Sequence, residues 1–100
     1  MLEKNIEGKL RNQVKQLGGL CLKFESPGYT GVPDRVILLP GAKVIFAETK
    51  QPGKKERARQ EYVQRVFRAL GFTVFSSVDR QEKISAVLAA CREVMNDGAV

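Results

Sequence analysis

Apolar residues repeat with two different spacings along the chain, and these spacings divide it into helices and strands. Over residues 2–17 they recur every three or four positions, which predicts an amphipathic helix. The same spacing predicts a second helix over residues 55–70. A third helix is predicted after Asp79, because Asp79 and Glu82 have the spacing of a capping box and an apolar stripe follows them.

Shorter apolar runs, rich in β-branched and aromatic residues, predict four strands. They lie over residues 20–25, 34–39, 43–50 and 72–77. The predicted element order is therefore αβββαβα. Three consecutive strands, a crossover helix and a further strand predict an α/β fold with a mixed central sheet flanked by helices. No repeat or linker interrupts this pattern, so residues 1–100 are expected to form a single domain.

Residues 40–42, Pro-Gly-Ala, separate the second and third predicted strands and have the composition of a turn. If all three residues form the loop, Leu39 pairs with Lys43. The same register then places Asp34 opposite Glu48 at the other end of the hairpin. A two-residue loop would shift the register by one residue, and the sequence alone leaves that alternative open.

Asp34 and Glu48 carry the chemistry of this predicted hairpin. Opposed strand residues lie about 4.5–5.5 Å apart at Cβ, and two carboxylates that close are unfavourable without a cation between them. Lys50 faces the same side as Glu48, because the two residues are two apart on one strand. Together they can form a site for Mg²⁺ or Mn²⁺ that hydrolyses a phosphodiester, and the backbone carbonyl of Thr49 can join the metal ligands. Lys50 can orient or deprotonate the attacking water, or stabilise the charge of the transition state.

Each of these residues also has an ordinary structural explanation when it is taken alone. Asp34 can be a strand-entry aspartate that follows Pro33, and Glu48 and Lys50 can be a surface ion pair at the end of a strand. The short patterns Pro-Asp and Glu-x-Lys both occur by chance in many proteins. Their joint occurrence at complementary hairpin positions is what favours the metal site.

Two residues of the predicted helices add to the candidate site. Glu7 flanks the apolar stripe of the first helix beside Ile6, and it can reach the sheet edge as a further metal ligand. Gln60 falls on the apolar stripe of the second helix, three residues before Val63, so its amide is expected to face the sheet and to need polar partners there. The alternatives are an exposed Glu7 and a Gln60 that reaches solvent.

The chain is basic, with 17 lysine and arginine residues against 11 aspartate and glutamate residues, and its net charge is +6. A basic stretch beside a candidate catalytic edge predicts an anionic polymer as partner, although a solvated helix face is the alternative. The expected nucleic-acid contacts are Lys54, Lys55, Arg57 and Arg59. Tyr29, in the loop that leads to Asp34, can touch a base or ribose, or can instead pack over its own loop.

The sequence also limits the compartment and the ligands of the protein. No apolar run approaches the roughly 20 residues that span a bilayer, and the charged residues 1–5 lack the apolar stretch of a signal peptide. A cytoplasmic protein without a membrane partner is therefore expected. Histidine is absent and Cys21 and Cys91 form no CxxC pair, which argues against zinc and predicts two buried free thiols.

The residues singled out for chemistry are Glu7, Pro33-Asp34, Glu48-Thr49-Lys50 and Gln60. In this order and spacing they resemble the PD-(D/E)xK nuclease superfamily, and more narrowly the VRR-NUC family in its small stand-alone form from phages and bacteria. The resemblance covers residues 3–95. It implies a restriction-endonuclease-like αβββαβ core with an additional C-terminal helix. It also implies that the three acidic residues bind metal, that Lys50 is catalytic and that Gln60 supports the site.

The same resemblance implies a function and an assembly. It implies a metal-dependent DNA endonuclease of phage or bacterial origin that acts on branched or structured DNA such as Holliday junctions. Stand-alone members of this size resemble Holliday-junction resolvases in being homodimers, so the first or the third predicted helix is expected to offer an apolar dimer surface. The competing hypothesis is a nucleic-acid-binding module with a nuclease fold that needs a partner protein for cleavage.

Overall fold

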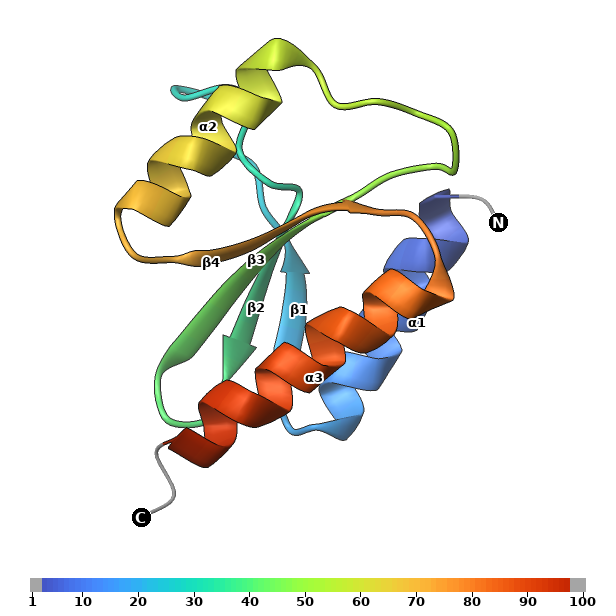
Figure 1. The fold of residues 1–100 in the computed structure, drawn as a ribbon. Helices are drawn as coiled ribbons and strands as arrows, with labels where there is room; N and C mark the ends of the chain where they lie inside the picture. Colours follow the sequence, from blue (N-terminus) through green and yellow to red (C-terminus); the bar gives the residue numbers. More distant parts are fainter. Residues whose placement is uncertain (1–2, 98–100) are drawn as a thin grey trace.

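Three helices pack on a four-stranded sheet in the computed structural model of the chain, which describes residues 3–97 (Figure 1). The elements are α1 (Glu3–Gln16), β1 (Leu20–Lys23), β2 (Arg35–Leu39), β3 (Lys43–Thr49), α2 (Ala58–Ala69), β4 (Thr73–Val78) and α3 (Gln81–Asp97). The predicted order αβββαβα and the α/β class are confirmed. The largest boundary difference is at α2, which begins at Ala58 rather than at residue 55. Residue 2, where the first helix was expected to begin, lies outside the described residues.

The sheet is mixed, as predicted, and its strand order is β1-β2-β3-β4. The first three strands are antiparallel, whereas β4 runs parallel to β3 and is reached through α2. A crossover of this kind is what a parallel pair requires. Figure 1 shows α1 and α3 together on one side of the sheet and α2 on the other side, next to β4. No helix in the described part of the chain is both long and apolar enough to cross a membrane.

The hairpin between β2 and β3 has the predicted three-residue loop. Leu39 pairs with Lys43, and the same register continues to the pair of Arg35 and Ala47. Gly41 and Ala42 complete the loop with positive φ angles of 82° and 60°, the left-handed region that glycine enters without strain. The register therefore brings Asp34, one residue before β2, next to Glu48 in β3.

Alternation along the strands divides the apolar residues between the two faces of the sheet. The odd-numbered apolar residues of β2 and β3, such as Ile37 and Ile45, are buried in the main core beneath α1 and α3. The helices fill this core with Ile6, Leu10, Val14, Ile84, Val87, Leu88 and Cys91. Their apolar stripes are thus used inside the molecule. None of the large exposed apolar side chains of the described residues lies on α1 or α3, so these helices do not offer the expected apolar dimer surface.

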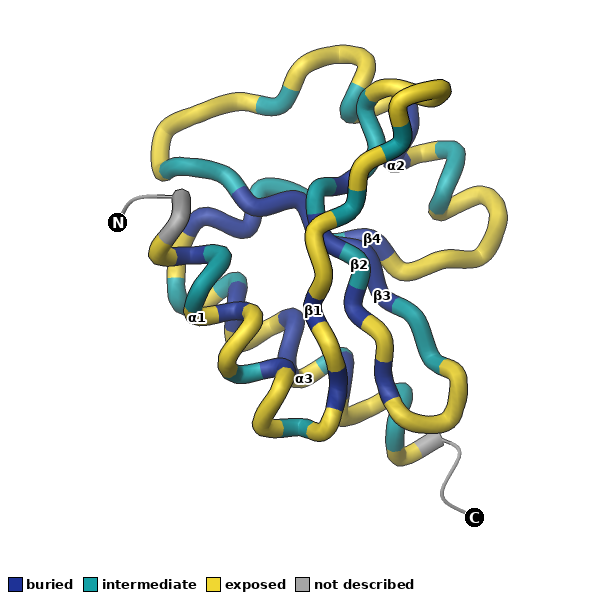
Figure 2. The backbone as a smooth tube through the Cα atoms, turned by 180° about the vertical axis from the view of Figure 1, so that it is seen from behind, coloured by how far each residue is buried: buried dark blue, intermediate teal, exposed yellow. Residues whose placement is uncertain are grey.

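The opposite face of the sheet is only partly covered. Phe46 of β3 meets Phe67 of α2 with ring centroids 4.9 Å apart, in an edge-to-face arrangement. Beyond this aromatic contact the helix does not extend over β1 and β2. Leu20, Leu22 and Leu38 remain 54%, 44% and 41% exposed there. Figure 2 shows the resulting alternation of buried and exposed positions along these two strands.

The predicted capping box at Asp79 is wrong. The helix α3 begins at Gln81, and its first turn is closed by a hydrogen bond from the Ile84 N–H to the carbonyl of Arg80. The carboxylate of Asp79 instead accepts a hydrogen bond from Arg80 Nε at 3.0 Å and lies 3.7 Å from Lys83 Nζ. Two neighbouring cations therefore draw this carboxylate away from the end of the helix.

The cysteines provide a test of the core. Cys21 and Cys91 are buried free thiols, as predicted, and burial raises the pKa of each to about 11. Because the thiolate is the reactive form, we expect a chromogenic disulfide reagent at pH 8 to modify both thiols slowly in the folded protein and rapidly in denaturant. Absorbance against time measures the two rates. Rapid modification of the native protein would show that this side of the core is open.

Candidate active site

The main chain at the mouth of the hairpin joins the two central carboxylates. The backbone N–H of Asp34 donates a hydrogen bond to Oε1 of Glu48 at 3.1 Å. The side chain of Glu48 is 6% exposed, and Asp34 is half-buried. The predicted neighbourhood of these two residues is thus present, and it extends the hairpin register by one residue beyond the strand.

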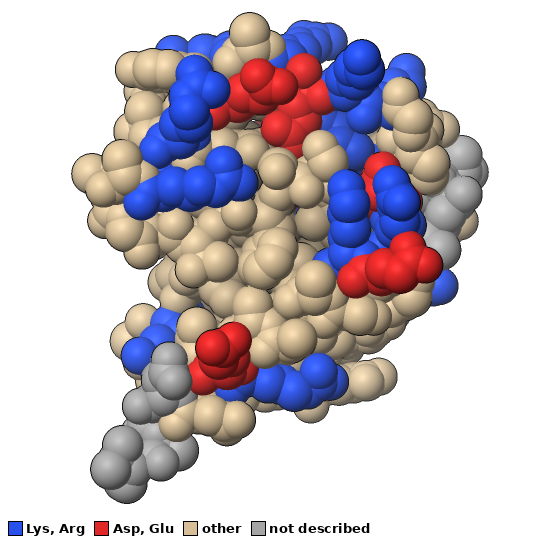
Figure 3. Space-filling view, in the orientation of Figure 1, with Lys and Arg blue, Asp and Glu red and all other residues tan. Residues whose placement is uncertain are grey.

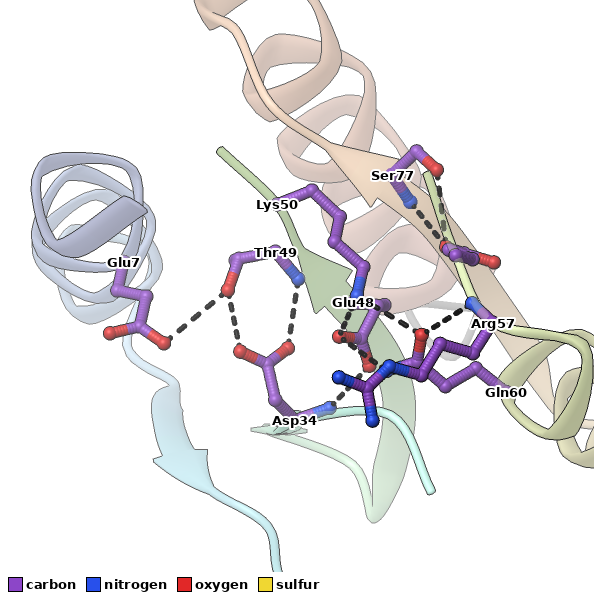
Figure 4. A network of polar contacts seen from close by, with 9 residues as sticks. Glu7, Asp34, Glu48, Thr49, Lys50, Arg57, Gln60 and Ser77 are labelled. Atoms are coloured by element: carbon purple, nitrogen blue, oxygen red, sulfur yellow. Dashed lines mark hydrogen bonds and ion pairs between the residues drawn. The ribbon is translucent and has the colours of Figure 1, made fainter. Parts of the chain in front are cut away.

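The carboxylate of Asp34 is held by a single residue of β3. It accepts hydrogen bonds from the Thr49 backbone N–H at 2.8 Å and from the Thr49 hydroxyl at 2.5 Å. The side chain of Thr49 does point away from Glu48 and Lys50, as expected from strand alternation (Figure 4). Its hydroxyl has a role that the sequence did not indicate, because it fixes the orientation of Asp34.

Lys50 and Gln60 form the other half of the network around Glu48 (Figure 4). Lys50 Nζ lies 3.5 Å from Glu48 Oε2 and donates a hydrogen bond to Gln60 Oε1 at 3.0 Å. The Nε2 of Gln60 donates in turn to Glu48 Oε2 at 3.4 Å. Gln60 Oε1 also accepts the backbone N–H of Arg57 at 3.0 Å, at the start of α2. The amide therefore reaches the site rather than solvent, and it links α2 to both charged groups.

Glu7 approaches the site from α1 with a partner that sequence reasoning missed. Its Oε2 lies 3.2 Å from Nη2 of Arg35, and its Oε1 accepts a hydrogen bond from the Thr49 hydroxyl at 3.4 Å. Arg35 is buried, because strand alternation places it on the core face with Ile37 and Leu39. A charged residue in such a position needs a buried partner, and this signal could have identified the pair of Glu7 and Arg35.

Burial makes both central carboxylates reluctant to ionise. It is the largest cause that raises the pKa of Asp34 to about 6, while hydrogen bonds from Thr49 act in the opposite direction. Burial also raises the pKa of Glu48 to about 7, with the charge of Asp34 as the second cause and Lys50 opposing both. At neutral pH the pair therefore favours additional positive charge close to it.

The donor set fits a hard divalent cation with few protein ligands. No three acidic or cysteine side chains of the described residues are grouped so that they could hold a metal ion. Glu7 contacts Arg35, and its carboxylate is also close enough to Asp34 to be one of the causes that raise the pKa of that residue. Mg²⁺ commonly takes one or two carboxylates and keeps several waters. Asp34, Glu48 and the carbonyl of Thr49 are an oxygen set of that kind.

A hollow of about 420 Å³ opens beside the network. Its lining residues are Thr30, Gly31, Lys50, Arg57, Arg59 and Gln60. Arg59 forms one wall, where its guanidinium lies 4.7 Å from the ring centroid of Tyr29 and its Nε donates to the Thr30 carbonyl at 2.9 Å. Gly31 permits this close packing, because it has a φ of +90° and a Cβ there would lie 2.8 Å from Arg59 Cγ.

The structure thus places the predicted nucleic-acid contacts in two settings. Arg59 of α2 lies over the ring of Tyr29, which stays 38% exposed. Lys54, Lys55 and Arg57 are exposed, and with Lys50 they line an adjoining hollow of about 350 Å³. Cations therefore surround the approach to Lys50.

Comparison with known proteins gives the chain its family. No family model matches it. It is 42% identical over 88 residues to "Putative nuclease p44" of Acyrthosiphon pisum secondary endosymbiont phage 1, which covers 88% of this chain and 92% of that protein. A solved structure of a VRR_NUC domain matches the fold with a TM-score of 0.79 and 25% identity, over 87% of this chain and 94% of that one. The phage relative and the shared fold together show that the chain belongs to the VRR-NUC family of nucleases.

Proposed function

We propose that this nuclease is a divalent-metal-dependent DNA endonuclease that holds Mg²⁺ or Mn²⁺ at Asp34 and Glu48. The observation that carries the proposal is the pair of carboxylates with raised pKa values at the mouth of one hairpin, with Lys50 Nζ 3.5 Å from Glu48. The carbonyl of Thr49 completes the protein ligands, and Glu7 acts through its hydrogen bond with the Thr49 hydroxyl.

Phosphodiester hydrolysis needs an activated water, neutralised phosphoryl charge and a stabilised leaving oxygen. A divalent cation bound at the two carboxylates would meet all three of these needs. The ammonium of Lys50 orients the water or neutralises charge on the phosphoryl oxygens in the transition state. Gln60 is a positioning residue, because it accepts a hydrogen bond from Lys50 and donates one to Glu48.

The exposed cations around the two hollows beside Lys50 support DNA as the substrate. Lys54, Lys55, Arg57 and Arg59 contact the phosphate backbone in this proposal, and Tyr29 contacts a base or ribose at the rim of the hollow. The substrate is branched DNA such as a Holliday junction, cut in the cytoplasm of a bacterial cell. The phage origin of the relative supports this setting. The single domain acts without a partner protein.

A homodimer would present two such sites to two strands of a branched DNA. The exposed apolar strip of Leu20, Leu22 and Leu38 supports such a dimer. Leu20 lies opposite Leu38 in the register of β1 and β2, and β1 is an edge strand that a second copy can reach. We infer that a second copy of the chain covers this strip.

Removal of either the Asp34 carboxylate or the Lys50 ammonium should abolish cleavage. We expect Asp34→Asn and Lys50→Ala each to lower the rate at which the purified chain cuts a labelled four-way junction in Mg²⁺ by about 100-fold or more. Lys15→Ala, which removes an exposed cation from α1, should cut at the wild-type rate, and EDTA should stop all cutting. Equal rates for all variants would remove these residues from the mechanism. A wild-type chain that binds but never cuts would favour a module that needs a partner protein.

The raised pKa values predict the pH dependence of stability in EDTA. The folded-state pKa values of Asp34 and Glu48 are about 6 and about 7, above those of the unfolded chain, so unfolding releases protons in this range. The free energy of unfolding should therefore fall as the pH rises from about 4 to about 7. Urea denaturation measures it.

Divalent metal should reverse this loss of stability. At pH 7.5, Mn²⁺ should raise the free energy of unfolding of the wild-type protein, since it binds the folded state. Asp34→Asn, which removes one of the two charges, should depend less on pH and gain little from Mn²⁺. A wild-type stability that rises between pH 4 and 7, with no effect of metal, is the contrary result.

Disruption of the apolar strip should separate the copies. Light scattering should give twice the chain mass of 11.1 kDa for the wild-type protein, and the single-chain mass for Leu22→Glu. Leu70→Glu is the matched control, because Leu70 is 70% exposed on another part of the surface, and it should remain dimeric. A wild-type monomer, or a dimeric Leu22→Glu variant, would exclude this interface.

A further inference from the structure

A hollow of about 490 Å³ lies between α2 and β4, outside the candidate active site. Its basic lining residues are Lys54, Lys55, Arg65 and Arg68. Glu56 and Glu61 are its acidic members, so the four cations outnumber the carboxylates. Figure 3 shows Lys and Arg side chains on both sides of a small acidic patch over α2 and the loop before it. The hollow therefore has the charge to receive an anion.

This hollow is continuous with the site of chemistry. Lys50 and Arg57 line both the hollow at the active site and the adjoining one of about 350 Å³. Lys54 and Lys55 line that adjoining hollow and also the one between α2 and β4. Shared lining residues thus connect all three into one basic path. The succession of cations along it suits an extended chain of phosphates rather than a single small anion.

Gln64 gives the outer hollow a specific feature. Its side chain lines the hollow, the residue is only 2% exposed, and its Nε2 finds no hydrogen-bond partner among the described residues. Buried amide donors are almost always paired in folded proteins. This Nε2 is itself buried, and a phosphate oxygen in the hollow supplies the acceptor that it lacks once the amide turns toward the hollow.

The surrounding side chains are held in place for such a ligand. Arg68 lies one turn after Gln64 on α2, and its Nη2 donates a hydrogen bond to the Val74 carbonyl of β4 at 2.9 Å. Glu56 Oε1 accepts hydrogen bonds from the Ser77 backbone N–H at 2.9 Å and from the Ser77 hydroxyl at 3.2 Å. The carboxylate of Glu56 is therefore engaged with β4, and this contact anchors the loop that carries Lys54 and Lys55.

We propose that this outer hollow binds a backbone phosphodiester of the DNA strand that passes through the active site, at a position away from the bond that is cut. Gln64 donates a neutral hydrogen bond to the phosphate, and Arg65 and Arg68 neutralise its charge. The inference rests on the proposed function for the identity of the polymer. It adds Gln64, Arg65 and Arg68 of α2 to the DNA-binding surface. These residues lie outside the basic loop that precedes the helix.

The salt dependence of binding distinguishes the charged contacts of the arginines from the neutral hydrogen bond of Gln64. The anisotropy of a labelled four-way junction is measured in EDTA, where cleavage does not interfere, over a series of salt concentrations. Arg65→Ala should weaken binding about tenfold and lower the slope of log affinity against log salt by about one, because one phosphate contact is lost. Gln64→Leu should weaken binding about tenfold without a change in slope, because it removes no charge.

Arg92→Ala is the matched control, since it removes an exposed arginine from α3, away from the basic path. Its affinity and slope should equal those of the wild-type protein. Arg65 is exposed, so its replacement should leave the fold intact, and thermal melting checks this for each variant. Wild-type affinity in both Gln64→Leu and Arg65→Ala would overturn the inference.

Neutral methylphosphonate groups, placed at one backbone position at a time, locate the contact on the DNA. The wild-type protein should lose affinity at one position away from the cut, and Arg65→Ala should lose less there than the wild-type protein does, because one of its charge contacts is already absent. If the wild-type protein cuts DNA but lacks this position, the inference fails and the proposed function stands. If it shows the position but never cuts in Mg²⁺ or Mn²⁺, the proposed function fails and the phosphate site stands.

Discussion

Two carboxylates at the mouth of one hairpin are the constraint on which the rest of this site depends. The three-residue loop fixes the register of β2 and β3, and the register brings Asp34 beside Glu48. Burial then raises both pKa values into the neutral range. Thr49 and Lys50 compensate part of this charge from within the chain. In our proposal a divalent cation at the same position completes the compensation, which ties the proposed chemistry to the fold.

The two faces of the sheet supply different parts of the site. The core face carries Arg35, which holds Glu7 of α1 against the hydroxyl of Thr49. The helix on the opposite face contributes Gln60, which joins Lys50 to Glu48. One turn further along α2, Gln64 lies in the outer basic hollow. The same helix thus holds Lys50 through Gln60 and lines the proposed path of the DNA, so movement of α2 would affect both.

The sequence predicted what depends on local spacing. The apolar periods gave the element order, and the turn at residues 40–42 gave the register that joins Asp34 to Glu48. Features that depend on competition between neighbours were missed or wrong. Asp79 and Glu82 have the spacing of a capping box, but the carboxylate of Asp79 pairs with adjacent cations instead. Alternation alone could have shown that Arg35 is buried, whereas the acceptor role of Asp34 toward the Thr49 hydroxyl depends on side-chain orientation, which spacing does not specify.

The dimer surface illustrates the same limit. An amphipathic pattern shows that a helix has an apolar face, but it does not show whether the core of the same chain already covers that face. Here α1 and α3 use their stripes internally, and the large apolar side chains left exposed among the described residues lie elsewhere, Leu22 and Leu38 of the sheet among them. Only the arrangement of the whole sheet distinguishes the two cases.

The most direct test of the central claim is a crystal structure of the protein with Mn²⁺, measured for anomalous scattering. Our account predicts an anomalous peak bonded to the carboxylates of Asp34 and Glu48, and no such peak in crystals of Asp34→Asn. A peak at another group of side chains, with none at this pair, would contradict it.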